Sequence, residues 1–528
     1  MARTSVMQRA AAMPSIHERA LGVYVRTPDG GLIRCVGLHS QWIQYTWSAI
    51  RSTVIATRPS LDHCLKVCLP GNDDDFGLQE VDIYERQRAN TESIVGFMLK
   101  PALPGWTIGT MSIDQLFAEL ILDRIDITAT TLPAVTEPSV DLTIEQIVNL
   151  FDKELRYCVQ NDQWEAQGRS YFAEKVRFFV RHSSTLQLCL PAFPCKSSNL
   201  DKVIGVLPDR GEEIALRRLH AFAHQVEQIY PPGAKILIIS DGHVFSDCIG
   251  VDDETVDKYG EHLKVLNQAI SLAMGEENER VQFQSLVDLF NLRSVSPLTS
   301  PIAVGMLDLP ELQHYLATNL DNIAELCRRI LVAGCQPSEE SLRTQIKSGD
   351  ESTLALYRGF SRFMLQDLDR HPLTQSQSRS QRKKLAAKVS FEMILRNQAY
   401  SNLIELIFPD CLRLSIHAHN NSGPKFGVRL FDTATVRAIG QLDSIGSGGI
   451  KTDEGVVTAS HLLHIPTPWH NCVVEIAGDP KLYIVKYGVV KEGSFIPKYS
   501  SDLIRGDLAK GEGAFVSLRR PVDSVSTT

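Results

Sequence analysis

The chain has 528 residues, of which 43% are hydrophobic and 22% charged, and its formal net charge is −8. Such values are typical of a globular protein with a large core, in about two to four domains or as one large enzyme domain with additions. The net negative charge creates no positive electrostatic field that would attract nucleic acid. No run of about 18 apolar residues predicts a membrane-spanning helix. The eleven cysteines lack framework spacing, which indicates reduced thiols and a cytoplasmic location.

The N-terminal part of the chain predicts structure but no chemistry. Residues 1–19 are expected to be a disordered tail, and residues 20–135 form an N-terminal region of unknown role. Short strands are predicted at 31–36 and 93–98, and Ser112 is predicted to cap a helix.

Residues 136–300 alternate between helical and apolar strand patterns. Strands are predicted at 186–190, 235–240 and 280–283, and an amphipathic helix at 210–230. This alternation favours an α/β fold, with a Rossmann-like, mostly parallel sheet and flanking helices.

The rest of the chain is predicted to be helical over 301–410 and rich in strands over 411–520. The strand-like segments Arg413–His417 and Phe426–Leu430 are separated by the turn residues Asn420–Pro424, which predicts a hairpin. We therefore expect antiparallel strands in the C-terminal part.

Two loops directly follow predicted parallel strands, at Pro191–Asn199 and Asp241–Gly250. Parallel sheets place ligand-binding loops at the carboxyl ends of their strands. The second loop contains Asp241, His243 and Asp247, whose pKa values would shift on burial and suit them to acid–base catalysis. An ordinary Asp-Gly turn is the alternative interpretation.

Several other polar residues are candidates for binding an anionic ligand. Lys196 and Ser197 offer an ammonium and a hydroxyl group, although a solvated loop explains them equally well. Lys383 lies in a charge run that is poorly placed for the helix dipole, and such a run is usually a solvated face.

Three polar residues alternate in the first of the two C-terminal strands. Arg413, Ser415 and His417 should therefore point to one face of the sheet, where they need solvent or a ligand. Trp469 and His470 form an aromatic pair that could line a pocket or close the core.

The histidines are compatible with a metal site but do not define one. His417 and His419 could combine with His461, His464 or His470, yet no carboxylate ligand is clearly placed. The glycine cluster at 446–449 follows no convincing strand, so we interpret it as a flexible loop and not as a dinucleotide site. We expect neither a metal nor a cofactor.

Five motifs occur in an order that resembles a known family. They are Leu190–Ser197, Ile239–Asp247, Leu356–Phe360, Arg413–His417 and Thr467–His470. Their sequence is similar to the isocyanide synthases, the family of pyoverdine-chromophore and spore-wall dityrosine biosynthesis enzymes. The resemblance covers about residues 142–485, and the N-terminal extension is similar to that of fungal members.

The resemblance implies a cofactor-independent, lyase-type reaction of secondary metabolism. Family members convert the amine of an L-amino acid to an isonitrile, with ribulose 5-phosphate as the one-carbon donor. Spore-wall relatives instead yield N-formyl tyrosine. Nucleic acid and membrane partners are not implied, although downstream biosynthetic enzymes are possible partners.

The expected chemistry implies a role for each candidate residue. Asp241, with His243 and Asp247, would move protons, and His243 stands at a position where relatives vary. Lys196, Lys383 and Arg413 would bind phosphate with help from Ser197 and Ser415, and Arg413 is also a candidate for the amino-acid carboxylate. His417, Trp469 and His470 complete the expected substrate-binding set.

Two functions from other classes remain open at this point. One is a metal-dependent oxygenase that uses the C-terminal histidines. The other is a non-catalytic protein that binds a sugar phosphate.

Overall fold

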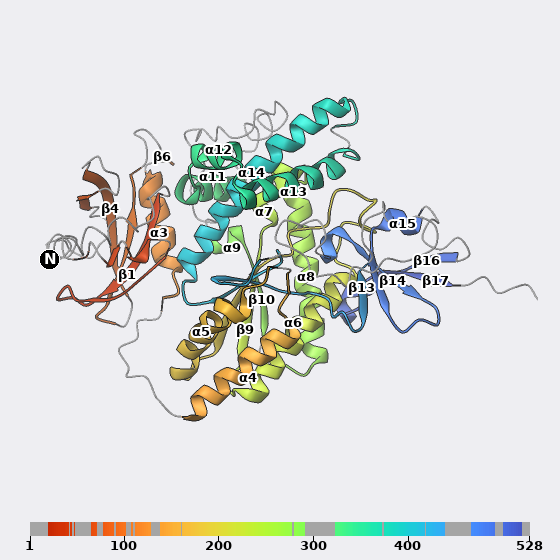
Figure 1. Ribbon diagram of the computed structural model, residues 1–528, viewed down its shortest axis with the longest axis horizontal. Coiled ribbons are helices and arrows are strands. Elements are labelled where there is room, and N and C mark those ends of the chain that lie inside the picture. Colours follow the sequence, from red (N-terminus) through yellow and green to blue (C-terminus); the bar gives the residue numbers. More distant parts are fainter. Residues whose placement is uncertain are drawn as a thin grey trace, which may run out of the picture. The chain divides into compact units, whose positions relative to one another are not determined.

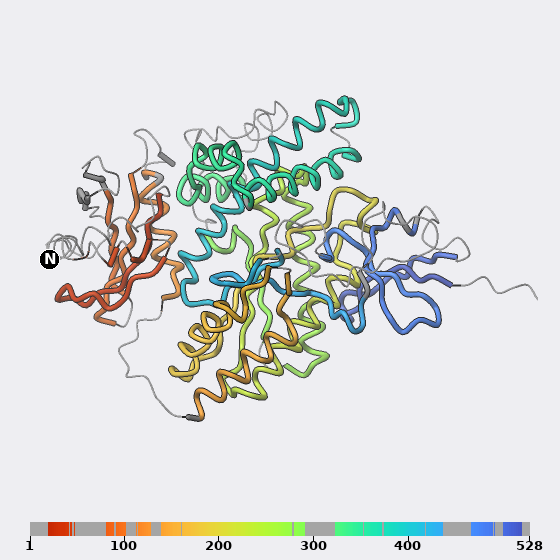
Figure 2. The backbone as a smooth tube through the Cα atoms, in the orientation of Figure 1, coloured from red at the N-terminus to blue at the C-terminus, as the bar shows by residue number. Residues whose placement is uncertain are grey.

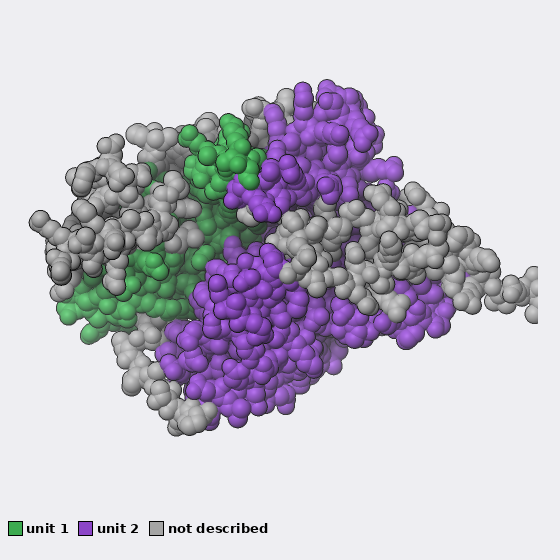
Figure 3. Space-filling model, in the orientation of Figure 1, with its two compact units in different colours: residues 1–133, 286–349, 391–410 green, residues 134–285, 350–390, 411–528 purple. Residues whose placement is uncertain are grey.

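The protein forms two compact units (Figure 3), and Figure 1 labels its helices and strands. The structure is a computed structural model that describes residues 19–37, 39–41, 43–44, 47, 65–70, 78–88, 91–101, 107–108, 111–127, 138–159, 161–276, 279–290, 323–371, 374–417, 419–438, 466–491 and 500–519. Unit 1 comprises residues 1–133, 286–349 and 391–410, and unit 2 comprises residues 134–285, 350–390 and 411–528. The five-part division expected from the sequence stays a prediction.

Unit 1 is built on an antiparallel five-stranded sheet in the order β2-β1-β5-β4-β3. Both strands predicted in this region are confirmed, as β2 and β5, and Ser112 caps α3 by accepting a hydrogen bond from the Gln115 amide at 3.1 Å. The elements of unit 1 are β1 (Ala20–Arg26), β2 (Leu32–Val36), β3 (Leu65–Pro70), β4 (Leu78–Gln87), β5 (Ile94–Leu99), β6 (Thr107–Ile108), β7 (Met111–Ser112), α3 (Ile113–Arg124), α9 (Leu286–Phe290), α11 (Ile323–Cys335) and α12 (Glu339–Ser348).

Unit 2 contains a parallel five-stranded sheet, which confirms the predicted α/β fold. Its strand order is β10-β9-β8-β11-β12, and every neighbouring pair is parallel. The elements up to this sheet's last strand are α4 (Pro138–Glu154), the π-helical turn η1 (Trp164–Gly168), α5 (Arg169–Arg181), β8 (Leu186–Pro191), α6 (Arg210–Ile229), β9 (Ala234–Ser240), α7 (Gly242–Ile249), α8 (Asp253–Ala273), β10 (Val281–Ser285), α13 (Glu351–Leu368), β11 (Leu412–Ser415) and β12 (Lys425–Gly427). Helix α14 (Arg379–Ile407) contributes residues to both units.

The predicted hairpin between β11 and β12 is wrong, because these two strands run parallel. The predicted turn residues do bend the chain, but the strand that follows them does not return antiparallel to β11. Asn421 is fully buried and adopts a positive φ of 55°. Its side-chain amide donates to the Tyr157 carbonyl at 2.8 Å and to Asp162 at 2.6 Å, while its Oδ1 accepts from the Gly427 amide at 2.8 Å. These distant contacts turn the chain into a parallel crossover.

The core of unit 2 lies on one face of the parallel sheet. Alternate strand residues belong to a single apolar cluster, which also contains side chains from α4, α5, α6 and α8. The strand residues in this cluster include Leu186, Leu188, Leu190, Ile236, Ile238, Leu412 and Leu414. Their neighbours Gln187, Lys235, Arg413 and Ser415 are only half-buried, so the polar residues point to the opposite face.

The segment Asp241–Gly250, predicted to be a loop, is mostly the helix α7. Gly242 opens this helix against the preceding loop, since a Cβ at that position would lie 2.2 Å from the Pro194 carbonyl oxygen. Gly250 ends the helix with a positive φ of 71°, a conformation that favours glycine. Asp241 is thus a helix N-cap residue and not a turn residue.

A second, mixed sheet completes unit 2, in the order β13-β15-β14-β17-β16. The expected antiparallel C-terminal strands are confirmed in the pairs β14/β15 and β16/β17, whereas β13/β15 and β14/β17 are parallel. Its elements are β13 (Val436–Ala438), the 3-10 turn η6 (Pro468–His470), β14 (Cys472–Ile476), β15 (Leu482–Val485), α15 (Tyr487–Lys491), β16 (Ser500–Ile504), the 3-10 turn η7 (Leu508–Lys510) and β17 (Phe515–Arg519).

Among the residues with a described position, no helix is long and apolar enough to cross a membrane.

Phe151 should be a key packing residue of unit 2. It is fully buried, stacks on Phe172 with ring centroids 4.2 Å apart, and touches the rings of Trp164, Phe222 and Phe426. We expect Phe151→Ala to lower the free energy of unfolding by about 3–5 kcal/mol, because it leaves a cavity among rings that cannot collapse.

Chemical denaturation followed by circular dichroism measures this change. Leu142→Ala on the same helix is the matched control, because Leu142 is 62% exposed and should change stability little. Equal stability of the two variants would show that the aromatic cluster is not a stabilising core.

Candidate active site

The parallel sheet has a topological switch point between β8 and β11. From β8 the chain proceeds outward through β9 to β10, and it later returns to the other side of β8 to form β11 and β12. Figure 2 shows this late segment lying beside the strands formed earlier in the chain. Connections at such a point diverge to opposite sides, which leaves room for a ligand at the carboxyl ends of the strands. The residues following β8, β9 and β11 all lie at this edge.

Asp241 is the titratable group that directly follows β9. Its Oδ1 atom is buried and has no hydrogen-bond partner, and the side chain makes no cap hydrogen bond to α7. Burial raises its pKa from 3.8 to about 7, although a backbone hydrogen bond and the charge of Arg413 act in the opposite direction. Near neutral pH this carboxyl group can therefore both donate and accept a proton.

Arg413 lies on β11, on the polar face of the sheet. Its register partner on β8 is Cys189, and its Nη1 lies 3.7 Å from the Cys189 sulfur. The pKa of Cys189 is lowered to about 6, first by a hydrogen bond from Cys411 and further by Arg413, against the effect of burial. Arg413 also lowers the pKa of Asp241, so the guanidinium group and the carboxyl group belong to one electrostatic site.

The histidines beyond β11 are held in neutral form. Burial lowers the pKa of His417 to about 4 and that of His419 to about 3, and Lys425 adds to both effects. The Ser415 hydroxyl bonds to the His419 ring at 2.9 Å and accepts from the His417 amide at 3.2 Å. Neutral imidazoles next to Arg413 add polar atoms to the site without adding charge.

Lys196 lies in a buried ionic cluster that was not foreseen from the sequence. Its Nζ contacts Asp209 and Glu212 at 2.7 Å each and donates to the Pro468 carbonyl at 2.9 Å. These contacts match the three N–H donors of an ammonium group. Lys196 thus joins the loop after β8 to the start of α6 and to η6, and its expected phosphate contact stays a prediction.

A second group of polar residues lies around Asp367 of α13. Asp367 Oδ1 accepts from the Ser197 hydroxyl at 3.2 Å and lies 2.6 Å from Lys202 Nζ. The Lys202 ammonium sits 4.1 Å above the ring of Phe363, whose ring centroid is 4.7 Å from that of His470. Sequence reasoning had named Ser197 and His470 but had missed Lys202 and Asp367.

Lys486, which follows β15, was also missed. Its ammonium group donates to the His470 carbonyl. Burial lowers its pKa to about 7, Lys202 lowers it further, and Asp367 acts in the opposite direction. Burial also lowers the pKa of His470 well below its usual value, and His417 and Lys202 contribute to that shift. The Lys202, Lys486 and His470 group is thereby coupled to the residues at the end of β11. The sequence offered one signal for Lys486, namely a lysine directly at the end of an apolar strand.

The remaining predicted residues lie elsewhere or serve packing. His243 is buried in α7 with its Nε2 3.0 Å from Asp257, and Asp247 is half-buried on the same helix. Trp469 is 1% exposed and packs on Phe193 at a ring distance of 5.2 Å. Lys383 is exposed on α14. Roles in catalysis or binding for these four predicted residues stay predictions.

Within the described part of the chain, no group of three or more His, Cys, Asp or Glu side chains is arranged to hold a metal ion. His461, His464 and the glycine cluster at 446–449 lie outside the described residues.

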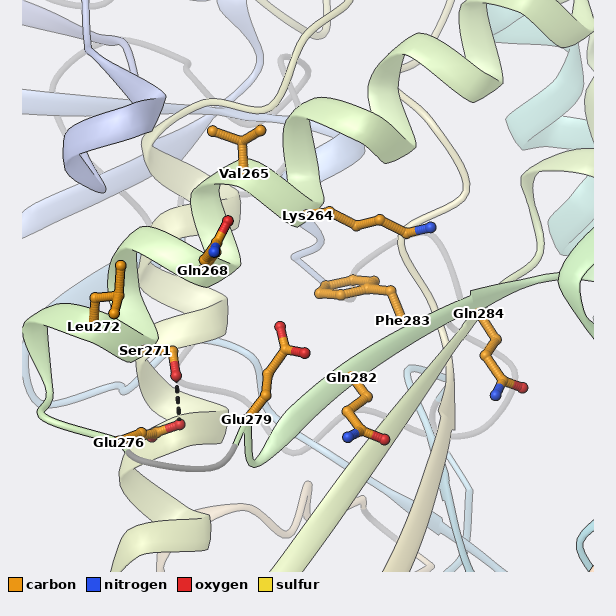
Figure 4. Close-up of a pocket in the computed structure, with 10 residues that line it drawn as sticks. All are labelled: Lys264, Val265, Gln268, Ser271, Leu272, Glu276, Glu279, Gln282, Phe283 and Gln284. Atoms are coloured by element: carbon orange, nitrogen blue, oxygen red, sulfur yellow. Dashed lines mark hydrogen bonds between the residues drawn. The ribbon is translucent and has the colours of Figure 1, made fainter.

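A pocket of 570 Å³ lies along the edge strand β10 and helix α8 (Figure 4). It is lined by residues of both elements, and Ser271 donates to Glu276 at 2.9 Å within it. None of the predicted site residues lines this pocket.

Comparison with known proteins identifies relatives along most of the chain. Residues 176–495 match the family model described as pyoverdine/dityrosine biosynthesis protein. The spore wall maturation protein DIT1 of Saccharomyces cerevisiae is 42% identical over 382 residues, which cover 72% of this chain and 68% of that protein. The L-tyrosine isonitrile synthase of Xenorhabdus nematophila is 33% identical over 260 residues, covering 49% of this chain and 67% of that enzyme.

A bacterial relative and a solved structure extend the comparison. The L-tryptophan isonitrile synthase AmbI2 of Fischerella ambigua is 30% identical over 301 residues, covering 57% of this chain and 71% of that enzyme. The crystal structure of PvcA from Pseudomonas aeruginosa superposes with a TM-score of 0.52 at 22% identity, covering 72% of this chain and all of PvcA. The latter likeness supports the fold.

Asp241→Asn should stabilise the protein in a pH-dependent manner. The carboxyl group ionises near pH 3.8 in the unfolded chain and near pH 7 in the folded chain, so its burial costs stability increasingly as the pH rises from 4 to 7. The neutral amide avoids this cost, and we expect its melting temperature to match wild type near pH 4 and to exceed it at pH 8. The shift corresponds to at most about 4 kcal/mol.

Thermal melts at pH 4.5, 6 and 8 measure the difference, with Asp502→Asn as the exposed control on β16. A variant that is less stable than wild type at pH 8 would mean that the fold stabilises the Asp241 carboxylate.

Proposed function

Because the chain belongs to the pyoverdine/dityrosine biosynthesis family, we propose that it is an isocyanide synthase acting on an L-amino acid. Ribulose 5-phosphate is the proposed one-carbon donor, and its C2 atom is the carbon that stays on the amino-acid nitrogen. The relatives whose names are L-tyrosine or L-tryptophan isonitrile synthase support the choice of an amino acid. We further propose a lyase-type reaction in the cytoplasm.

One observation carries the proposal beyond family membership. The carboxyl group of Asp241, whose Oδ1 is buried without a hydrogen-bond partner and whose pKa is about 7, shares the switch point of the sheet with the guanidinium of Arg413. Condensing an amine with a ketone requires both proton removal and proton donation at one place. It also requires that an anionic amino acid be held there. These two residues have the chemistry for both tasks.

We assign the first step of the reaction to Asp241. As a carboxylate it takes a proton from the substrate ammonium, and the free amine then adds to the ketone carbon of the sugar phosphate. As a carboxylic acid it returns the proton to the departing hydroxyl group, which leaves as water when the imine forms. Burial keeps both forms accessible near neutral pH.

We assign the amino-acid carboxylate to Arg413. A guanidinium group matches a planar carboxylate in two parallel hydrogen bonds, which an ammonium group does not. Ser415 and the neutral rings of His417 and His419 would then line the substrate beside it. Their low pKa values mean that they stay uncharged at neutral pH.

N-formyl tyrosine formation for the spore wall is the second candidate function. The 42% identity with a spore wall maturation protein favours it. An isonitrile and a formamide differ by one water molecule, so the same site could lead to either product. The mass of the product distinguishes them.

The proposed function is tested by incubating the purified protein with pooled L-amino acids and ribulose 5-phosphate carrying carbon-13 at C2. We expect mass spectrometry to find one amino acid that has gained a single labelled carbon. Asp241→Asn should lower this rate by roughly 10²- to 10⁴-fold, as loss of an acid–base group does. Asp502→Asn on β16 should match wild type.

Three outcomes would contradict the proposal. A folded protein that forms no labelled product, with or without added Fe(II), argues for the non-catalytic binding function. Activity that depends on Fe(II) and stops with a chelator argues for an oxygenase. Full activity of the Asp241→Asn protein removes that residue from the mechanism.

Arg413→Ala should raise the KM for the amino acid by about 10- to 100-fold, because a charge-assisted pair of hydrogen bonds is lost. The KM for ribulose 5-phosphate should change much less. Arg413→Lys should recover only part of the loss, since a lysine keeps the charge but not the planar geometry. Steady-state kinetics with each substrate varied in turn measures both constants, and an increase confined to the sugar phosphate would reassign Arg413.

A further inference from the structure

Two lysines, Lys202 and Lys486, form a second cationic group in unit 2. They come from distant parts of the chain and are joined through the backbone. The Tyr487 amide donates to the Lys202 carbonyl at 3.3 Å, and the Gly488 amide donates to the Asp201 carbonyl at 2.7 Å. The loop after β8 is thereby fixed to the segment after β15, and each contributes one ammonium group.

Lys202 is almost completely buried, with 4% of its surface exposed. Its Nζ lies 2.6 Å from Asp367 Oδ1, but without hydrogen-bond alignment, and 4.1 Å above the Phe363 ring. An aromatic face attracts a cation but accepts no proper N–H bond in place of an oxygen. The ammonium group therefore has donors available beyond those used by its protein neighbours.

Lys486 has an even poorer set of partners. Its ammonium donates to the His470 carbonyl, and the charged groups that act on it are Lys202, which repels it, and Asp367, which attracts it. Cys472 also faces it from β14, with a pKa that burial raises above its usual range. The thiol is therefore neutral at physiological pH.

The charges of this group do not balance. Among the charged groups described as acting on Lys486, Asp367 is the one carboxylate. Lys202 contacts the same carboxylate, so the two lysines share it. Lys196, by contrast, contacts two carboxylates as well as a carbonyl oxygen. Buried charges are normally paired, so the surplus positive charge calls for an anion.

We propose that Lys202 and Lys486 bind the phosphate group of a phosphate monoester, the co-substrate in the proposed function on which this inference rests. The Ser197 hydroxyl donates to Asp367, the carboxylate that Lys202 also contacts, and so supplies a further polar group. Ammonium groups are point charges that suit a tetrahedral dianion, whereas the planar guanidinium of Arg413 suits a carboxylate. The two substrates are thus held by two different kinds of cation.

Binding of a dianion should depend on the charge of Lys486. Burial lowers its pKa to about 7, so it is mostly charged below pH 7 and mostly neutral above it. A bound dianion favours the charged form, and affinity should fall as the pH rises through 7. The charged groups that face Lys486 are Lys202 and Asp367, and the Cys472 thiol stays neutral over this range because burial raises its pKa.

Sulfate is the probe of choice because its own charge is constant between pH 6 and 8.5. We expect calorimetric titration of the full-length protein to give an affinity that falls about tenfold or more over this range. Lys486→Met should bind sulfate at least tenfold more weakly at pH 6.5 and should lose the pH dependence. Lys481→Met, just before the same strand β15, is the matched control and should behave like wild type.

A measurement on the wild-type protein guards against misfolding of the variant. A lysine that is partly neutral near pH 7 reacts readily with an acylating reagent, and sulfate should slow the modification of Lys486 several-fold while leaving Lys481 unchanged. Peptide mass spectrometry measures both rates. Equal sulfate affinity of wild type and Lys486→Met, or no protection of Lys486, would overturn the proposal.

These results are separable from the proposed function, because sulfate binding requires no turnover. Labelled product together with unchanged sulfate binding in Lys486→Met would overturn the phosphate site alone. Loss of sulfate binding in that variant, in a protein that forms no product, would support the site and refute the synthase activity.

Discussion

The buried contact of Lys196 with Asp209 and Glu212 is the interaction on which the arrangement of the site depends. Its third bond, to the Pro468 carbonyl, connects the loop after β8 with the turn η6. A buried ion pair costs desolvation, so it contributes more to a specific arrangement than to net stability. Here it fixes where two loops meet. The Ser197 amide then bonds to the Trp469 carbonyl at 2.9 Å, which places Ser197 and His470 at the same edge.

Burial then gives the site its acid–base properties. It raises the pKa of a carboxyl group, Asp241, and lowers that of an amine, Lys486, and both arrive at about 7. Desolvation disfavours the charged form of either group, which moves acids and bases in opposite directions. The protein thereby obtains two groups that change charge near neutral pH without a histidine in that role. His417 and His419 have been shifted too low to change charge there.

Local patterns were sufficient to predict the parallel strands, the cap at Ser112, and the common face of Arg413 and Ser415. Contacts between distant residues were beyond the reach of these patterns. The hairpin after β11 was wrong because Asn421 bonds to Tyr157 and Asp162. The partners of Lys196 come from the start of α6 and from η6, which no loop pattern reveals. Lys202 and Lys486 are far apart in the sequence and form a cationic group only in the folded chain, so no local pattern indicates them.

The proposed two-substrate reaction between anions would explain why the site extends beyond the parallel sheet. One switch point offers one place for a ligand, and Arg413 and Asp241 lie there. A second anion placed there would be repelled by the first and would compete for the same guanidinium group. The C-terminal sheet supplies a separate cation, Lys486, and the turn η6 supplies His470 beside it. The proposed reaction would therefore require the later part of unit 2 for chemistry as well as for packing, because residues 134–285 alone contain Asp241 and Lys202 but neither Arg413 nor Lys486.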